Sequence, residues 1–187
     1  MHRRGLIVVG LVVAVLACAM WYSMRRPESQ EARGQPSAGA PTVRDTTREA
    51  ERTVRLYFAT PGGDSLAGEL RELASRPGLH ERVESLVREL VRGSRSGGVV
   101  LLAPGTALRH VYLDHRGLMT LDLTPAFRDR FDGGSTAEYL ALSSLARTLF
   151  ANVPEARRVR LVCAGEPLAT LGGHIACDLP FDRSDLP

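Results

Sequence analysis

The chain has 187 residues, 44% of them hydrophobic, which suits one domain with a packed core plus short attachments. All 24 basic residues are Arg, and four of them flank an apolar N-terminal segment. From Pro27 onward, 20 Arg stand against 21 acidic residues, a formal charge of −1. A nearly neutral domain lacks the clustered basic face that nucleic-acid binding requires, so we expect no nucleic-acid partner.

The N-terminal segment Gly5–Met24 is apolar and uncharged, and about 20 such residues span a bilayer. We therefore predict a membrane anchor over residues 1–26. The protein would cross the inner (cytoplasmic) membrane once, with its domain on the exported side. Two alternatives stay open. The lipobox-like Val-Leu-Ala-Cys18 would make a lipoprotein anchored at Cys18, and a cleaved signal peptide would leave no anchor.

Residues 27–52 are rich in Pro, Gly, Ser, Ala, Gln and charge, and show no apolar periodicity. Such a composition predicts a flexible linker. The folded domain is expected over residues 53–181, and a short C-terminal tail over residues 182–187.

The first part of the domain alternates between strand and helix patterns. Thr53–Phe58 alternates apolar and polar residues and predicts a strand. Leu66–Ala74 fits either a short helix or a second strand. Apolar residues recur with helical spacing from Leu79 to Val91, and Gly93 follows where a helix C-terminus is expected.

The middle of the domain reads as a β-hairpin that leads into a short helical turn. Two strands, Ala107–Leu113 and Leu118–Leu123, flank the turn at residues 114–117. Asp122 falls on the hairpin face opposite Met119 and is expected to be solvated or bonded to the turn before the next helix. A helical turn is predicted over Ala126–Phe131.

The clearest pattern is Gly133–Asn152, GGSTAEYLALSSLARTLFAN. Small and apolar residues recur at i, i+3 and i+4, which predicts a helix with one narrow face that can lie close to a sheet. Ser135 and Glu138 stand three residues apart, so we predict a capping box in which Ser135 caps the first turn.

The C-terminal part adds a buried-type strand over Val159–Cys163 and a last short strand over Leu168–Leu171. Few strands, two main helices and no alternating βαβ pattern favour the α+β class. We expect a small mixed or antiparallel sheet with both main helices packed on one face.

Six segments follow one another in a distinctive order: TVRLYFATPGGDSLAGELREL, LVRELVRGS, LLAPGTAL, MTLDLTPAF, GGSTAEYLALSSLARTLF and VRLVCAGEPLATLGGHIACDLPF. Together they resemble the GerMN domain, a sporulation and spore-germination domain of bacteria, over residues 53–181. The resemblance implies a compact α+β domain similar to the ring-building motifs of envelope assemblies. It also implies action through protein–protein contact, without an established enzymatic activity or a cofactor.

The anchor and the resemblance lead to one functional hypothesis and one alternative. The chain would be a non-enzymatic, membrane-anchored envelope protein whose exported domain binds a protein partner or itself, in sporulation or germination if its host undergoes them. The alternative is a peptidoglycan-binding or cell-wall-modifying accessory protein with Glu69, Asp122 or His174 in a cleft.

None of the five His has the spacing of a metal site such as His-Glu-x-x-His, and no Gly-x-Ser-x-Gly elbow surrounds Ser135. In a strand, Glu69 and Arg71 would share one face and could pair. The residues that we consider for partner binding are His174, Tyr139, Arg147, Glu69 and Arg71. Cys163 and Cys177 could form a disulfide in an exported domain, or remain two buried thiols.

Overall fold

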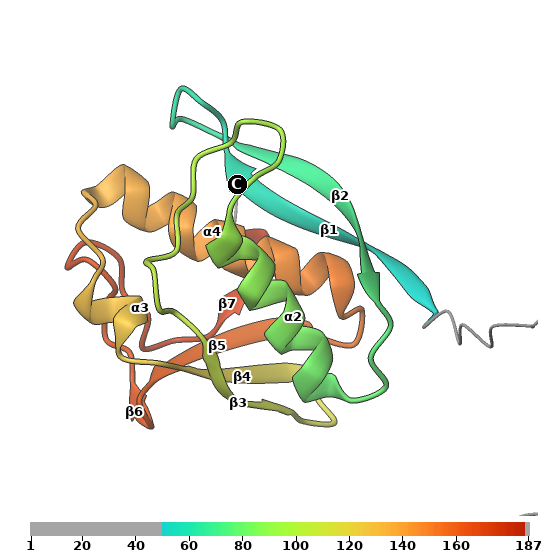
Figure 1. The fold of residues 1–187 in the computed structure, drawn as a ribbon. Coiled ribbons are helices and arrows are strands. Elements are labelled where there is room, and N and C mark those ends of the chain that lie inside the picture. Colours follow the sequence, from blue (N-terminus) through green and yellow to red (C-terminus); the bar gives the residue numbers. More distant parts are fainter. Residues whose placement is uncertain (1–49, 186–187) are drawn as a thin grey trace, which may run out of the picture. The chain divides into compact units, whose positions relative to one another are not determined.

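The computed structural model describes residues 50–185, which form an α+β domain with two β-sheets and three α-helices. Figure 1 shows helices α2 and α4 between a two-stranded ribbon and a larger sheet. The predicted anchor Gly5–Met24, Cys18 and the linker up to residue 49 lie outside the described residues. From residue 50 to residue 185, no helix has the length and apolar character that a membrane crossing requires.

The two-stranded sheet consists of β1 (Glu51–Ala59) and β2 (Leu66–Ala74), which pair antiparallel along their full lengths. The predicted strand at residues 53–58 is confirmed, because its alternate residues Val54, Leu56 and Phe58 are all buried. The stretch for which the sequence left helix and strand open is the strand β2.

The larger sheet is mixed. Its strands are β3 (Leu108–Leu113), β4 (Leu118–Leu123), β5 (Arg158–Cys163), β6 (Glu166–Pro167) and β7 (Phe181–Asp182). The order is β3-β4-β5-β6, with β7 also paired to β5, and β4 and β5 run parallel. The predicted strand over residues 168–171 is wrong. Leu168 and Leu171 are buried because they anchor a loop to the core, not because they extend a sheet.

The helices are α2 (Leu79–Arg92), α3 (Ala126–Asp129) and α4 (Ser135–Asn152). Both main helices are confirmed. Since parallel neighbours need a crossover connection, α3 and α4 serve as the link from β4 to β5. The sequence pattern did not reveal this β-α-β unit, and it predicted one sheet where the structure has two.

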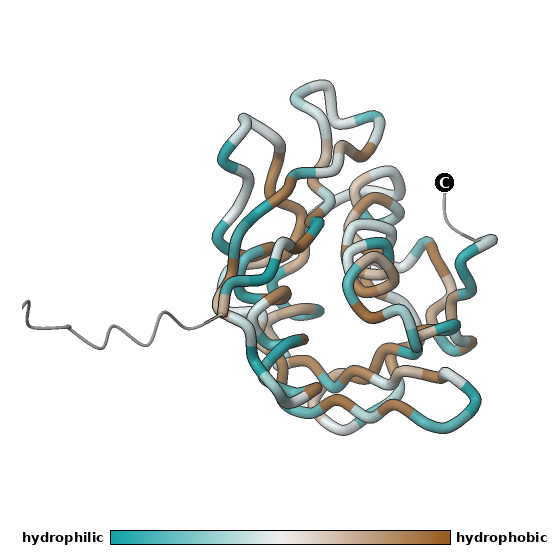
Figure 2. The backbone as a smooth tube through the Cα atoms, turned by 90° about the vertical axis from the view of Figure 1, so that its right-hand side faces the viewer, coloured by the Kyte–Doolittle hydropathy of each residue, from teal (hydrophilic) through white to brown (hydrophobic). Residues whose placement is uncertain are grey.

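The core lies where the two helices meet both sheets. Figure 2 shows apolar positions alternating along the strands. The fully buried large side chains include Leu56, Leu86, Leu90, Phe127, Met119, Leu121, Leu145, Leu149 and Leu161. As the composition indicates, this core consists mainly of aliphatic residues.

Helix α4 contacts β1 through a row of polar side chains. The Ser144 hydroxyl donates to the Tyr57 carbonyl (2.6 Å), and the Tyr57 N–H donates to Thr148 Oγ1 (3.1 Å). The Asn152 amide accepts from the Arg55 N–H (3.0 Å) and donates to the Arg55 carbonyl (2.7 Å). The helix therefore occupies the place of a neighbouring strand and closes this edge of β1.

The predicted capping box at the start of α4 is wrong. The cap position is Gly134, one residue earlier than expected, and no side chain bonds there. Ser135 is the first helical residue. Glu138 does not turn back to the helix end, because its carboxylate is buried against a loop from the C-terminal part of the domain.

Candidate interaction surfaces

The carboxylate of Glu138 is 0% exposed and holds a loop formed by residues 170–174. Its Oε1 accepts from the Thr170 hydroxyl (2.8 Å) and from the N–H groups of Leu171 (3.0 Å) and Gly172 (2.8 Å). Its Oε2 accepts from the N–H and Nδ1 of His174, each at 2.9 Å. Burial alone would raise the pKa of Glu138, but these donors lower it to about 2, so the carboxylate is ionised.

Two glycines make this contact sterically feasible. A Cβ on Gly172 would lie 2.7 Å from the Phe131 ring, so only glycine lets the loop approach the carboxylate. Gly173 has a φ of +93°, which side-chain-bearing residues rarely adopt. The Gly-Gly-His sequence is therefore required to build the loop around Glu138.

His174, predicted as a partner-binding residue, has one side of its ring committed to the fold. Because Glu138 is ionised, His174 Nδ1 must carry the proton that it donates. The side chain remains 49% exposed. The structure thus gives His174 a role in fixing the loop, and a partner could reach only the exposed part of the ring.

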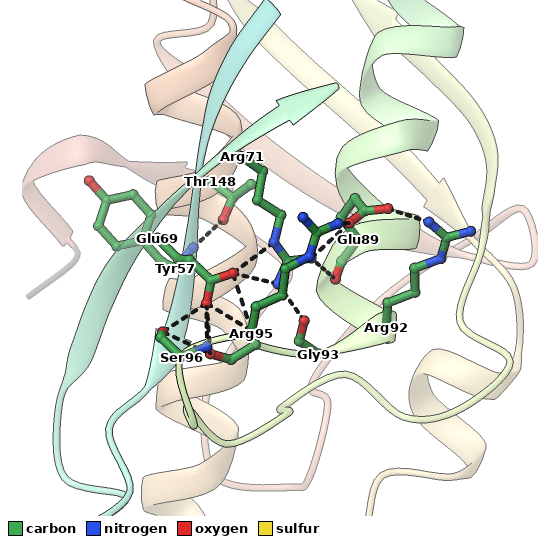
Figure 3. A network of polar contacts seen from close by, with 10 residues as sticks. Tyr57, Glu69, Arg71, Glu89, Arg92, Gly93, Arg95, Ser96 and Thr148 are labelled. Atoms are coloured by element: carbon green, nitrogen blue, oxygen red, sulfur yellow. Dashed lines mark hydrogen bonds and ion pairs between the residues drawn. The ribbon is translucent and has the colours of Figure 1, made fainter. Parts of the chain in front are cut away.

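Glu69 and Arg71 lie together, as a strand requires, and belong to a larger buried network (Figure 3). Arg71 is 4% exposed, and its guanidinium contacts Glu69 Oε1 (2.7 Å) and Glu89 Oε2 (2.7 Å). It also donates to the Gly93 carbonyl (2.5 Å) and lies over the Phe58 ring. Arg71 therefore fastens β2 to the C-terminal end of α2.

Glu69 fastens the loop that follows α2. Its carboxylate accepts from the hydroxyls of Ser94 (2.7 Å) and Ser96 (2.9 Å) and from the Arg95 N–H (3.0 Å). Burial favours the neutral acid, but hydrogen bonds from Ser94, Arg71, Ser96 and Arg95 lower the pKa of Glu69 to about 2. The predicted pairing of Glu69 with Arg71 is present, and both side chains serve the fold.

Asp122 is buried, contrary to the expectation of a solvated residue or a bond to the turn before the next helix. Its Oδ1 accepts from the Gly165 N–H (3.0 Å), and its Oδ2 lies 3.2 Å from Arg109 Nη1. The carboxylate therefore braces the turn between β5 and β6, because that turn is adjacent to β4 across the parallel pair.

Tyr139 lines an apolar hollow between α4 and the C-terminal segment. The hollow has a volume of about 270 Å³. Its lining residues are Tyr139, Leu142, Ser143, Ile175, Ala176, Leu179, Pro180 and Phe181. Leu179 is 73% exposed and Tyr139 is 39% exposed, so apolar surface faces solvent at the rim. Ser143, which also lines the hollow, is 0% exposed.

Arg147 lies elsewhere, in a second hollow that it shares with Tyr57, Phe150 and Arg183. Its guanidinium lies over the Tyr57 ring, 5.7 Å from the ring centroid. Arg147 is half-buried, and its charge remains accessible beside an aromatic face. The five predicted residues thus do not form one site: Glu69 with Arg71, His174, Tyr139 and Arg147 occupy distinct environments.

Cys163 and Cys177 are both buried free thiols. The Cys163 thiol donates to the Thr124 carbonyl (3.6 Å), and the Cys177 thiol donates to the Ile175 carbonyl (3.5 Å). Burial and the charge of Glu138 raise the pKa of Cys177 to about 11. Of the two states left open by the sequence, the structure has the thiol form.

Residues 50–185 contain no group of three or more His, Cys, Asp or Glu side chains arranged to hold a metal ion. Sequence reasoning missed the role of Glu138. The signal was its position: Glu138 shares the helical stripe of Ala141, Leu145 and Leu149. A carboxylate on a buried stripe needs partners, which here come from the Gly-Gly-His loop.

The chain is similar in fold to three solved structures. A protein of Clostridium perfringens described as a lipoprotein has a TM-score of 0.52 and 20% identity, over 73% of this chain and 91% of that one. The first GerMN domain of the sporulation protein GerM from Bacillus subtilis has a TM-score of 0.54 and 20% identity, over 72% of this chain and 99% of that one. The tandem GerMN domains of GerM have a TM-score of 0.56 and 18% identity, over 70% of this chain and 46% of that one. No curated protein matches significantly.

A family model described as sporulation and spore germination (Germane) matches residues 55–169, which is more than half of the chain. The match runs from β1 through the end of the β5–β6 region and includes α4 with its buried glutamate. The chain therefore belongs to the sporulation and spore germination family and carries a GerMN-type domain.

Proposed function

We propose that this protein is a non-enzymatic, membrane-anchored component of the bacterial cell envelope, and that its exported GerMN-type domain binds other proteins. The observation that carries the proposal is the apolar hollow beside α4, with Leu179 and Tyr139 exposed at its rim. Exposed apolar side chains around a shallow hollow are typical of protein-binding surfaces. The family's description supports a role in sporulation or germination.

The acids on which the cell-wall alternative depends favour the same view. Glu69 and Asp122 are occupied by hydrogen bonds that hold loops and strands together. A general acid or a sugar-binding carboxylate needs an oxygen that is free of internal hydrogen bonds and faces a cleft. Anchoring through Gly5–Met24 or a lipid on Cys18 is part of the proposal, and a lipoprotein among the similar structures supports it.

The proposal is tested by placing a photo-crosslinking amino acid at position 179 of the full-length protein in its own cells. The control carries the same group at His115, which is exposed in the β3–β4 turn. We expect a covalent adduct with a discrete protein at position 179 and none at position 115. If no protein adduct forms and the purified protein co-sediments with peptidoglycan, the peptidoglycan-binding alternative is favoured instead.

A further inference from the structure

The outer edge of β2 is open. In the hairpin, Arg55 pairs with Leu70 and Tyr57 pairs with Gly68. The N–H and C=O groups of Arg55 and Tyr57 point away from β2, because they bond to α4. In an antiparallel ladder their partners then also point outward. The backbone groups of alternate β2 residues, Leu66 to Ala74, therefore face away from β1.

This edge is exposed and regular. The side chain of Leu70 is 62% exposed at the middle of the strand, and Gly68 and Glu72 are exposed on either side. Among the described residues, no other segment bonds to these backbone groups. Figure 1 shows β2 on the outer side of the hairpin, with α4 on the other side of β1. The strand contains no Pro and no register shift, two of the devices that usually protect an edge, and its charged residues are Glu69, Arg71 and Glu72.

We infer that the β2 edge pairs with β2 of a second copy of this chain, forming an antiparallel four-stranded sheet across a two-fold axis. The inference rests on the proposed function and specifies one mode of it. Only one register overlaps the whole strand and matches outward-pointing residues with each other, and it centres on Leu70.

The sequence of β2 is self-complementary in this register. Leu70 meets Leu70 of the second copy, and the two exposed side chains pack together. Glu69 stands opposite Arg71 of the second copy, with both side chains bonded within their own copies, and Gly68 stands opposite Glu72. No like charges face each other directly, which is the arrangement that favours strand pairing. Because one strand pair is smaller than a standard interface, the association should be weak.

The first test is sedimentation equilibrium of the full chain in detergent. Leu70→Lys places two cations at the two-fold axis, whereas the control Tyr112→Lys changes another apolar strand residue that is 67% exposed. We expect Leu70→Lys to raise the dimer dissociation constant at least about tenfold and Tyr112→Lys to leave it within about twofold. Thermal melting of each variant checks that the fold is retained.

The second test traps the pair covalently. In a Cys18→Ser background, Leu70→Cys should form a disulfide-linked dimer in an oxidising glutathione buffer, since hydrogen-bonded strand partners lie about 5.5 Å apart. Tyr112→Cys should form little. A monomeric wild type with no Leu70→Cys dimer, or equal behaviour of both positions in both assays, would overturn the inference. A protein adduct at position 179 would then still support the proposed function, so the two failures are distinguishable.

Discussion

At the scale of single residues, buried carboxylates anchor irregular segments of this domain. Glu138 holds the loop at residues 170–174, Glu69 holds the loop after α2, and Asp122 holds the turn after β5. Each carboxylate accepts at least one backbone N–H, which satisfies a donor that the loop itself cannot satisfy. These carboxylates stabilise the fold. Because their oxygens are occupied by hydrogen bonds, we expect the domain to act by binding proteins rather than by catalysis.

Replacing Glu138 with Gln should destabilise the domain strongly. Both carboxylate oxygens only accept, whereas an amide turns its NH₂ group toward N–H donors on one side. We expect a loss of about 3 kcal/mol in the free energy of unfolding, measured by urea denaturation. Glu84→Gln, the same change at an exposed position on α2, should cost less than about 0.5 kcal/mol. Equal losses in the two variants would contradict the anchoring role.

Acid should destabilise the domain through the same groups. The pKa values of Glu69 and Glu138 are about 2 in the folded protein, against an ordinary value of 4.5. Between pH 5 and pH 2 the unfolded chain binds more protons, so stability is complete above about pH 5 and falls as the pH drops toward 2. Each group contributes on the order of 3 kcal/mol.

The measurement is the urea midpoint as a function of pH. We expect little change from pH 6 to pH 5, a steady fall from pH 5 to pH 3, and a shallower fall in Glu138→Gln than in wild type. A midpoint that does not change with pH over this range would show that neither carboxylate is held by its donors.

At the scale of elements, α4 organises the fold because it closes a strand edge as well as filling the core. Ser144, Thr148 and Asn152 follow one another at four-residue spacing and supply donors and acceptors to β1. Leu145 and Leu149, on an adjoining stripe, enter the core. Helix α4 therefore takes the place of a neighbouring strand beside β1 and also supplies apolar side chains to the core.

Two neighbouring serines on α4 test this role. Ser144→Ala removes the donor to the Tyr57 carbonyl and should cost about 1–2 kcal/mol. Ser143 is equally buried, but its hydroxyl has no hydrogen-bond partner among the described residues. Ser143→Ala should therefore be neutral or stabilising. Chemical denaturation of both variants gives the comparison, and a reversed order would refute the contact between α4 and the β1 edge.

Local patterns predicted the elements better than their partners. The alternation in β1 and the helical spacing in α2 and α4 reflect burial of one face, so their positions followed from the sequence. The second sheet and the crossover did not, because pairing between distant strands leaves no local pattern. For the same reason the spacing of Ser135 and Glu138 suggested a helix cap. In the structure the Glu138 carboxylate bonds to the loop at residues 170–174 instead, because that loop offers it several N–H donors.

At the scale of the whole molecule, the two-stranded sheet has one closed and one open edge, and the domain carries an apolar hollow. The edge of β1 is closed by α4, the edge of β2 is open, and the hollow lies between α4 and the C-terminal segment. With the proposed anchor, a domain with such surfaces would gain from the high effective concentration at a membrane, so weak contacts would suffice. We therefore expect the protein to work by contact with other proteins.

The most direct test is cross-linking mass spectrometry of the full-length protein in the membranes of its own cells. Because the chain contains no Lys, carboxylate-directed or photoactivated reagents are required. We expect inter-protein cross-links that concentrate around Leu179 or around Glu72 on the β2 edge, and few at exposed Glu155. Cross-links confined to the chain itself, with turnover of peptidoglycan by the purified protein, would contradict this expectation.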